Sequence, residues 1–233
     1  MDAFSDFAAR WREAGRDAGV EALGLLFPVW CAGCDRPGRV LCPTCIAAMA
    51  DPVRRPVAPG FTVWSAARFS GAGARAIRAL KEEGRTGVAR PLGVLIAALV
   101  VTAGWTDATL VPVPTSRAAL RRRGYAVPEL LAARTGLPWT RLLRVRAHSV
   151  ADQRELDRRA RERNVAGSVA VRAGAAGRTV VLVDDVVTTG ATLREACRTL
   201  EAAGERVLGA VAAADTPRRI PPAPESDNRV PHH

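Results

Sequence analysis

The residues best suited to chemistry lie in one segment, Val180–Thr192, with the sequence VVLVDDVVTTGAT. Val180–Val183 is a short aliphatic run typical of a buried parallel strand. Asp184 and Asp185 follow it directly. Ionised carboxylates only accept hydrogen bonds, so the pair suits the vicinal hydroxyl groups of a ribose. The segment therefore predicts a strand that ends in a sugar-binding acidic pair.

A Thr- and Gly-rich turn comes next and leads into a predicted helix, Ala191–Ala203. A turn of this kind at a helix N-terminus presents backbone amides and the positive end of the helix dipole to a phosphate. Gly190 permits close approach of the backbone, and the threonine hydroxyls can donate further bonds. The predicted phosphate-binding residues are Val186, Val187, Thr188, Thr189, Gly190, Ala191 and Thr192. Acidic pair and turn together indicate a ribose 5-phosphate site.

Four of the five cysteines form the pattern C-x2-C-x7-C-x2-C: Cys31, Cys34, Cys42 and Cys45. Paired CxxC knuckles supply four thiolates to one tetrahedral zinc ion and leave no open position for catalysis. We therefore expect a structural zinc site whose metal helps a short segment to fold. Four incidental buried thiols and a redox pair remain as alternatives. The fifth cysteine, Cys197, is expected to be a core residue.

The segment Val180–Thr192 resembles the 5-phosphoribosyl 1-pyrophosphate (PRPP) motif of type I phosphoribosyltransferases. Three further stretches are similar to the ComF family, in which a cysteine ribbon precedes the transferase domain: Phe27–Cys45, Leu110–Tyr125 (LVPVPTSRAALRRRGY) and Arg144–Asn164 (RVRAHSVADQRELDRRARERN). The resemblance covers about residues 20–214. It implies transfer of a phosphoribosyl group from PRPP, with Mg²⁺, to a nitrogen nucleophile and release of pyrophosphate.

The resemblance also implies roles for individual residues. The catalytic set is Asp184, Asp185, Lys81 and Arg123. The expected pyrophosphate-binding residues are Pro114, Thr115, Arg117, Arg121 and Arg122, where arginine forks can bind phosphate oxygens bidentately. A mobile loop would cover the site with Arg144, Arg146 and Gln153. His148 is a candidate base for the acceptor by residue type alone.

Three departures from the ComF pattern lie outside the PRPP motif. Ala126 and Val127 follow Tyr125 where the family usually has Asn-Gln, and two glutamates follow Lys81. The approach to Gln153 is one residue longer than in the family. These changes touch the acceptor side, so the acceptor stays open.

Charge favours a phosphate-bearing partner without identifying it. The 233-residue chain has a formal net charge of +11, and the stretch 115–163 has 13 arginines against 5 acidic residues. Such a patch attracts either a phosphorylated small molecule or nucleic acid. A non-catalytic ComF-like factor in DNA uptake, meeting DNA or a helicase, is therefore the alternative to an enzyme. Only Tyr125 and Trp139 are available in this stretch to stack on bases.

The resemblance implies an α/β fold of the type I phosphoribosyltransferase class, which is Rossmann-like with a mostly parallel sheet flanked by helices, together with a small N-terminal zinc ribbon. We expect a helix over 1–24, a four-cysteine zinc-ribbon module over 25–55, the α/β domain over 58–214 and a disordered tail over 215–233. Predicted strands are Phe61–Phe69, Leu110–Val113, Val165–Val171, Val180–Val183 and Val207–Ala213. Predicted helices are Ala72–Leu80, Pro91–Ala103, Ala118–Ala133 and Ala191–Ala203.

The longest apolar run, Leu92–Gly104, is 13 residues, shorter than the roughly 20 that a membrane-spanning helix needs. Charged residues break up the first dozen positions, so no signal peptide is expected. We expect a cytoplasmic location.

Overall fold

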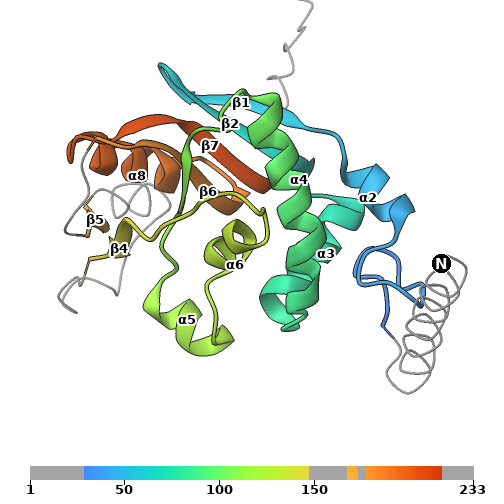
Figure 1. The fold of residues 1–233 in the computed structure, drawn as a ribbon. Coiled ribbons are helices and arrows are strands. Elements are labelled where there is room, and N and C mark those ends of the chain that lie inside the picture. Colours follow the sequence, from blue (N-terminus) through green and yellow to red (C-terminus); the bar gives the residue numbers. More distant parts are fainter. Residues whose placement is uncertain (1–28, 147–166, 173–176, 217–233) are drawn as a thin grey trace, which may run out of the picture.

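The computed structural model describes residues 29–146, 167–172 and 177–216 (Figure 1). The helix expected over 1–24, most of the tail, His148 and Gln153 lie outside these residues. No helix within the described ranges is long and apolar enough to cross a membrane.

A five-stranded sheet in the order β1-β2-β7-β6-β3 forms the centre of the fold. Its strands are β1 Val53–Ala58, β2 Phe61–Arg68, β3 Thr109–Pro112, β6 Thr179–Val187 and β7 Arg206–Asp215. Only the β1–β2 pair is antiparallel; the other three pairs are parallel. The chain therefore has the expected α/β fold with a mostly parallel sheet. The short strands β4 Leu143–Val145 and β5 Val169–Val171 form a separate antiparallel pair.

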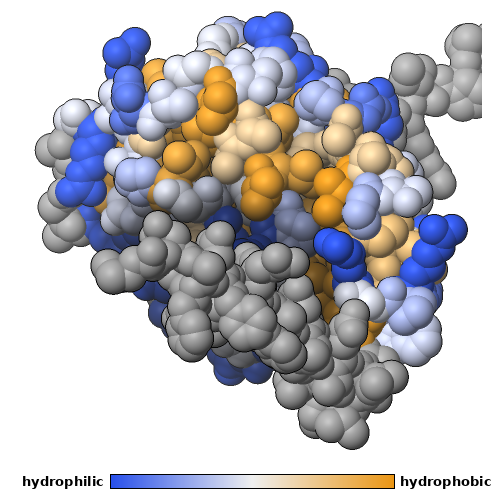
Figure 2. Space-filling model, turned by 45° about the vertical axis from the view of Figure 1, so that its right-hand side comes forward, coloured by the Kyte–Doolittle hydropathy of each residue, from blue (hydrophilic) through white to orange (hydrophobic). Residues whose placement is uncertain are grey.

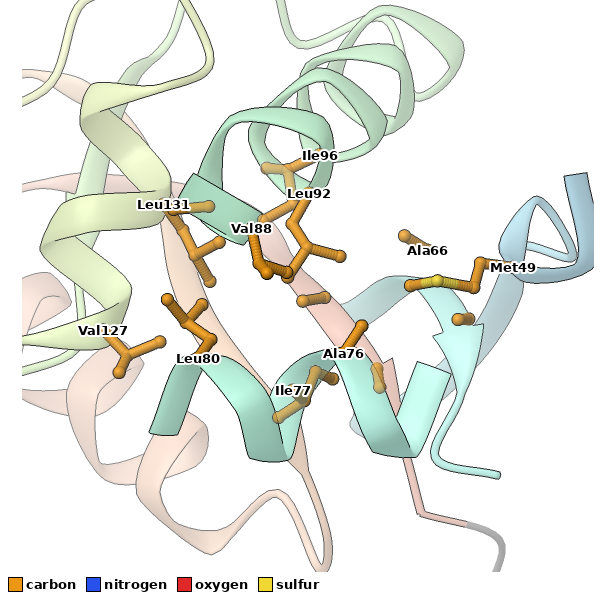
Figure 3. Close-up of a cluster of buried hydrophobic side chains, with 14 of the residues drawn as sticks. Met49, Ala66, Ala76, Ile77, Leu80, Val88, Leu92, Ile96, Val127 and Leu131 are labelled. Atoms are coloured by element: carbon orange, nitrogen blue, oxygen red, sulfur yellow. The ribbon is translucent and has the colours of Figure 1, made fainter. Parts of the chain in front are cut away.

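Alternation along the central strands divides the core between the two faces of the sheet. On β6, Val181 and Val183 belong to one buried cluster, whereas Val180 and Leu182 belong to the other. The first cluster lies against α3 Gly71–Glu82, α4 Ala89–Thr102 and α6 Val127–Ala133, as Figure 3 shows. The second lies against α8 Ala191–Glu201. Both faces are covered, as a parallel sheet requires.

The segment that carries the four cysteines continues the first of these cores. Its helix α2, Pro43–Met49, directs Met49 toward Ala66 of β2 and Ala76 of α3 (Figure 3). Between this segment and α4 lies an apolar groove of about 540 Å³, whose wall includes Val94, 60% exposed. Figure 2 shows apolar side chains gathered across one face of the molecule.

The helix predicted over Ala118–Ala133 is wrong, because the chain forms two helices there. The first, α5 Arg117–Arg123, ends where Gly124 adopts a left-handed φ of 79°. The second, α6, begins at Val127 and has a proline in its first turn. Glycine just past a helix end and proline at a helix start are standard boundary signals, and here they outweigh the helical pattern.

Other bounds also differ from the expectations. Strand β6 continues to Val187, four residues beyond the predicted Val180–Val183, because its pairing with β7 runs on to Asp215. Helix α2 and strands β1 and β4 were not predicted from the sequence.

Candidate active site

The acidic pair lies near the carboxyl end of β6, the edge of an α/β sheet where ligands bind. β6 has a parallel strand on each side, β7 and β3. The backbone N–H of Asp185 donates to Asp184 Oδ1 at 2.8 Å, and that of Val186 donates to Asp185 Oδ1 at 2.7 Å. One oxygen of each carboxylate is therefore fixed by a local backbone bond.

Lys81 reaches this pair from the last turn of α3. Its Nζ lies 2.9 Å from Asp185 Oδ1, and the two side chains are only 22% and 14% exposed. Ile77, one helical turn before Lys81, and Leu80, directly before it, are buried in the core. Packing of this apolar face orients the helix, so Lys81 is held toward β6.

The two carboxylates have different electrostatic surroundings. Burial and the neighbouring Asp185 charge raise the pKa of Asp184 to about 8, although the Asp185 N–H and the more distant Lys81 oppose the shift. Desolvation and like charge both favour the protonated form of a carboxyl group. Asp184 therefore keeps its proton up to a pKa of about 8, and the neighbouring Asp185 forms an ion pair with Lys81.

The turn after β6 is a tight loop that runs directly into α8. Gly190 is the N-cap of α8 with φ 75°, and a Cβ placed on it would lie 2.8 Å from Val57 Cγ1. Thr188 and Thr192 are exposed, and the Ala191 N–H donates to Thr189 Oγ1 at 3.3 Å. A small hollow is lined by Asp184, Val186, Val187, Thr188, Gly190, Ala191, Thr192 and Leu193. Six of the seven residues predicted to bind phosphate line this hollow, and Thr189 lies beside it in the loop.

A second cavity, of about 420 Å³, lies next to Lys81. Its lining residues are Lys81, Glu82, Glu83, Gly84, Arg122, Arg123 and Tyr125. The Tyr125 hydroxyl donates to the Leu80 carbonyl and so ties the end of α5 to the end of α3. Two arginines from one segment and a lysine from another therefore converge next to the acidic pair.

The structure does not bring all the predicted residues to these two hollows. Pro114 and Thr115 are half-buried in the loop after β3, and Arg117 and Arg121 are exposed on α5. Arg144, from the predicted mobile loop, lies in β4 opposite Ala170. The Arg146 N–H donates to the Ser168 carbonyl at 2.8 Å. The roles assigned to these residues stay predictions.

Sequence reasoning missed three charged residues behind the loop Thr188–Thr192, which we call the phosphate loop: Arg55, Asp215 and Arg194. Arg55 Nε lies 2.9 Å from Asp215 Oδ2, and Arg55 Nη1 donates to the Thr188 carbonyl at 2.9 Å. The alternation of Val53, Arg55 and Val57 could have indicated a strand with an inward-facing arginine. No motif, however, connects β1 to a loop 133 residues further along the chain.

The four cysteines form a compact group whose Sγ atoms all lie within 4.8 Å of one another. Burial raises the pKa of Cys31, but N–H donors from Cys42 and Gly33 outweigh it and bring the pKa to about 6. Burial also raises the pKa of Cys45. A Cβ on Gly33 would lie 2.6 Å from Cys45 Sγ, so glycine is needed for the backbone to turn this closely around the sulfurs. Four soft donors in such a group fit a tetrahedral zinc ion.

One comparison with known proteins covers the acidic pair and the loop that follows it. Residues 119–231 match the model of the phosphoribosyl transferase domain. The matched part contains the acidic pair, the phosphate loop and Arg123, whereas Lys81 and the four cysteines precede it. The comparison with curated proteins finds no match.

Solved structures of adenine phosphoribosyltransferases are similar to this chain over most of their length. The Rhodothermus marinus enzyme is 18% identical, with 76% of this chain and 95% of that chain covered and a TM-score of 0.38. The Leishmania tarentolae enzyme is 16% identical, with 69% and 80% covered and a TM-score of 0.40. UMP synthase of Leishmania donovani is 20% identical, with 60% of this chain covered and a TM-score of 0.35. The match spans only about a quarter of the length of UMP synthase, 24% of that chain.

Proposed function

We propose that this protein binds PRPP with Mg²⁺ and transfers its phosphoribosyl group to a nitrogen acceptor. The observation that carries the proposal is the arrangement around β6. An acidic pair that suits a ribose diol lies between a Gly-capped loop that suits a phosphate and a cavity lined by three cationic side chains. The match of residues 119–231 to the phosphoribosyl transferase domain supports the same chemistry.

The residues divide the work by position. The loop Thr188–Thr192 would bind the 5-phosphate through amides and hydroxyls. Asp184 and Asp185 would accept hydrogen bonds from the ribose hydroxyls. Mg²⁺, bound with PRPP, would neutralise part of the negative charge of its phosphate groups.

In the transfer step, the acceptor nitrogen forms a bond to C1 while the bond from C1 to the pyrophosphate oxygen breaks. Pyrophosphate leaves with the bonding electron pair, so negative charge grows on it. Lys81, Arg122 and Arg123 line one cavity, where they can stabilise that charge. The proton released by the acceptor passes to solvent or to a base on the acceptor side.

Calorimetric titration with PRPP and Mg²⁺ tests this function. We expect saturable binding by the wild type and its loss in the double variant Asp184→Asn/Asp185→Asn. The matched control is Asp107→Asn/Glu201→Gln, which removes two exposed carboxylates away from the two hollows. Absence of binding by folded wild type, or equal binding by both double variants, would overturn the proposal.

We also propose that the four cysteines hold a structural zinc ion. Their compact arrangement and full set of thiol donors support this assignment. Metal analysis of the purified protein should find one zinc per chain, and a clearly lower content would exclude it.

The DNA-associated alternative is supported by the exposed arginines Arg117, Arg121 and Arg122 on α5. The substitution Arg117→Ser/Arg121→Ser should leave PRPP affinity unchanged within about twofold if α5 serves nucleic acid. In that case a fluorescent oligonucleotide should bind the wild type with a steep salt dependence that the variant reduces. PRPP binding that the same variant weakens strongly would assign these arginines to the small-molecule site.

A further inference from the structure

Strand β1 directs two side chains to the phosphate loop from the edge of the sheet. Alternate residues of a strand share one face of the sheet. Arg55 and Val57 are partly buried on one face of β1, whereas Arg54 and Pro56 are exposed on the other. Val57 lies against Gly190, and Arg55 contacts Thr188. One face of β1 therefore supports the loop, although β1 pairs only with β2.

Arg55 is held in place by an ion pair with the last residue of β7. The Asp215 side chain is 7% exposed and that of Arg55 is 15% exposed, so water screens the pair little. Asp215 pairs in register with Val187, the last residue of β6, and the next N–H, of Thr216, donates to the Val187 carbonyl at 2.8 Å. The guanidinium is thus anchored where the phosphate loop begins.

Two arginines hold two consecutive carbonyl groups of the loop. Arg55 Nη1 donates to the Thr188 carbonyl at 2.9 Å, and Arg194 Nη1 donates to the Thr189 carbonyl at 2.9 Å. A trans peptide unit is planar, with its C=O and N–H pointing in opposite directions. Fixing the two carbonyls therefore also fixes the N–H groups of Thr189 and Gly190, which point away from the arginines.

We propose that Arg55 and Arg194 are positioning residues that set the amides of Thr189 and Gly190 for a phosphate group. This inference rests on the proposed function. It adds the residues that orient the loop amides before a ligand binds. Amides fixed in advance bind an anion with less loss of conformational freedom. The two guanidinium groups also place positive charge behind the loop, which favours a phosphate in front of it.

The test uses variants that keep or remove single contacts. Arg55→Lys retains a cation for Asp215 but lacks the fork that also reaches Thr188, and its control is Arg54→Lys on the exposed face of β1. Arg194→Gln removes the donor to Thr189, and its control is Arg198→Gln, which takes the same charge from the next turn of α8.

Ribose 5-phosphate is the probe, because it engages the loop without the leaving group. We expect Arg55→Lys and Arg194→Gln each to weaken its binding about tenfold, the effect of one charged hydrogen bond, and the controls to change it less than twofold. Unfolding temperatures of the two variants should stay close to those of their controls. Wild-type affinity in both variants would overturn the inference. Failure of the wild type to bind either ribose 5-phosphate or PRPP would instead overturn the proposed function.

Backbone NMR relaxation tests the positioning without any ligand. The order parameters of the Thr189 and Gly190 amides should fall from about 0.85 toward about 0.6 in Arg55→Lys but not in Arg54→Lys, while those of Val181 and Val183 in β6 keep their values. Equal loop order parameters in the two variants would show that Arg55 does not hold the loop. Lower order parameters at all these amides together would indicate a general effect on stability and would also contradict the inference.

Discussion

Asp184 and Asp185 have the same side chain and occupy successive positions, but their electrostatic surroundings differ. Asp185 lies 2.9 Å from the Lys81 ammonium group. Asp184 is desolvated beside the Asp185 charge, which keeps its proton bound up to a pKa of about 8. Strongly shifted groups of this kind are common where a ligand binds. The raised pKa of Asp184 can be tested by measuring the free energy of unfolding at a series of pH values.

The first prediction concerns stability against pH. The pKa of Asp184 is above its ordinary value of 3.8 in the folded chain, so the folded state keeps a proton that the unfolded state releases. The associated stability is fully present below pH 3.8 and is lost as pH rises through about 8. The free energy of unfolding of the wild type, relative to Asp184→Asn, should therefore fall between about pH 4 and 8, by at most about 1.4 kcal/mol per pH unit.

Denaturant unfolding at a series of pH values measures this difference. Asp107→Asn, which removes an exposed carboxylate, serves as the control and should follow the wild type at every pH. Curves for wild type and Asp184→Asn that stay parallel throughout this range would show that Asp184 has an ordinary pKa.

The second prediction concerns Gly190. Gly190→Ala places a β-carbon in a left-handed conformation and 2.8 Å from Val57 Cγ1. Gly136→Ala is a matched control, because Gly136 has nearly the same φ, 76°, and no atom within 4 Å of the added carbon. The backbone strain should cost each variant about 1–2 kcal/mol of unfolding free energy. Gly190→Ala should lose about 1 kcal/mol more and bind PRPP at least about tenfold more weakly. Equal losses of stability and of binding in both variants would contradict a role for the close contact with Val57.

At the scale of elements, the sequence predicted those parts of the site that are formed by residues close together in the chain. The aliphatic run of β6, the turn at Gly190 and α8 follow one another in the chain, so the order of strand, turn and helix could be predicted before the fold was known. Lys81 was named through the family resemblance, but only the packing of α3 shows its distance from Asp185. The contact of Arg55 with Thr188 joins residues 133 positions apart and leaves no local pattern.

Errors at this scale have local causes. The arginine-rich stretch after β3 has helical spacing, and Gly124 was given less weight than that spacing. β1 contains Pro56, which is uncommon inside a central strand, but β1 lies at the sheet edge, where a missing N–H donor is tolerated. The boundary between α5 and α6 was thus missed because one glycine outweighed a longer helical pattern, whereas the end of β6 depends on its pairing with β7.

The third prediction links the cysteine group to α3. Arg75 Nε, on α3, donates to the Gly33 carbonyl at 2.5 Å, and Arg85, just beyond α3, donates to the Trp30 carbonyl. The cysteine segment therefore contacts α3 in its first half and just beyond its end, and Lys81 lies in the last turn between these contacts. Removal of the metal with a chelator should lower the unfolding temperature and also weaken PRPP binding severalfold, because α3 then no longer holds Lys81 beside Asp185.

Calorimetric titration before and after chelation, with zinc added back, measures both effects. Cys31→Ser should reproduce the chelated state, whereas Cys197→Ala, outside the group, should keep its metal and its PRPP affinity. Full PRPP affinity in metal-free protein that is still folded would show that the cysteine segment does not position Lys81.

At the scale of the whole molecule, the cysteine segment and the sheet share one core. Cys31, Leu41 and Met49 belong to the same buried cluster as Ile96 of α4 and Val211 of β7. A segment with its own core can unfold alone, but one whose apolar residues complete a neighbour's core loses them when that neighbour opens. The proposed division at residues 25–55 and 58–214 therefore describes the order of segments along the chain, whereas unfolding should involve them together.

This argument gives the fourth prediction. Thermal unfolding of the zinc-loaded chain should show one transition, with the same midpoint by tryptophan fluorescence and by the reactivity of the four thiols. In the proposed function PRPP contacts only the α/β part. At about a hundredfold excess over its Kd, it should nevertheless raise the free energy of unfolding by about 2.7 kcal/mol as reported by either signal. If the two parts unfold together, the two signals must shift equally, because a ligand bound at β6 then also keeps the cysteines on the far side of α3 from becoming reactive. If PRPP raised the fluorescence midpoint and left thiol reactivity unchanged, the cysteine segment would be an independent unit, and its contacts with α3 could not transmit metal loss to Lys81.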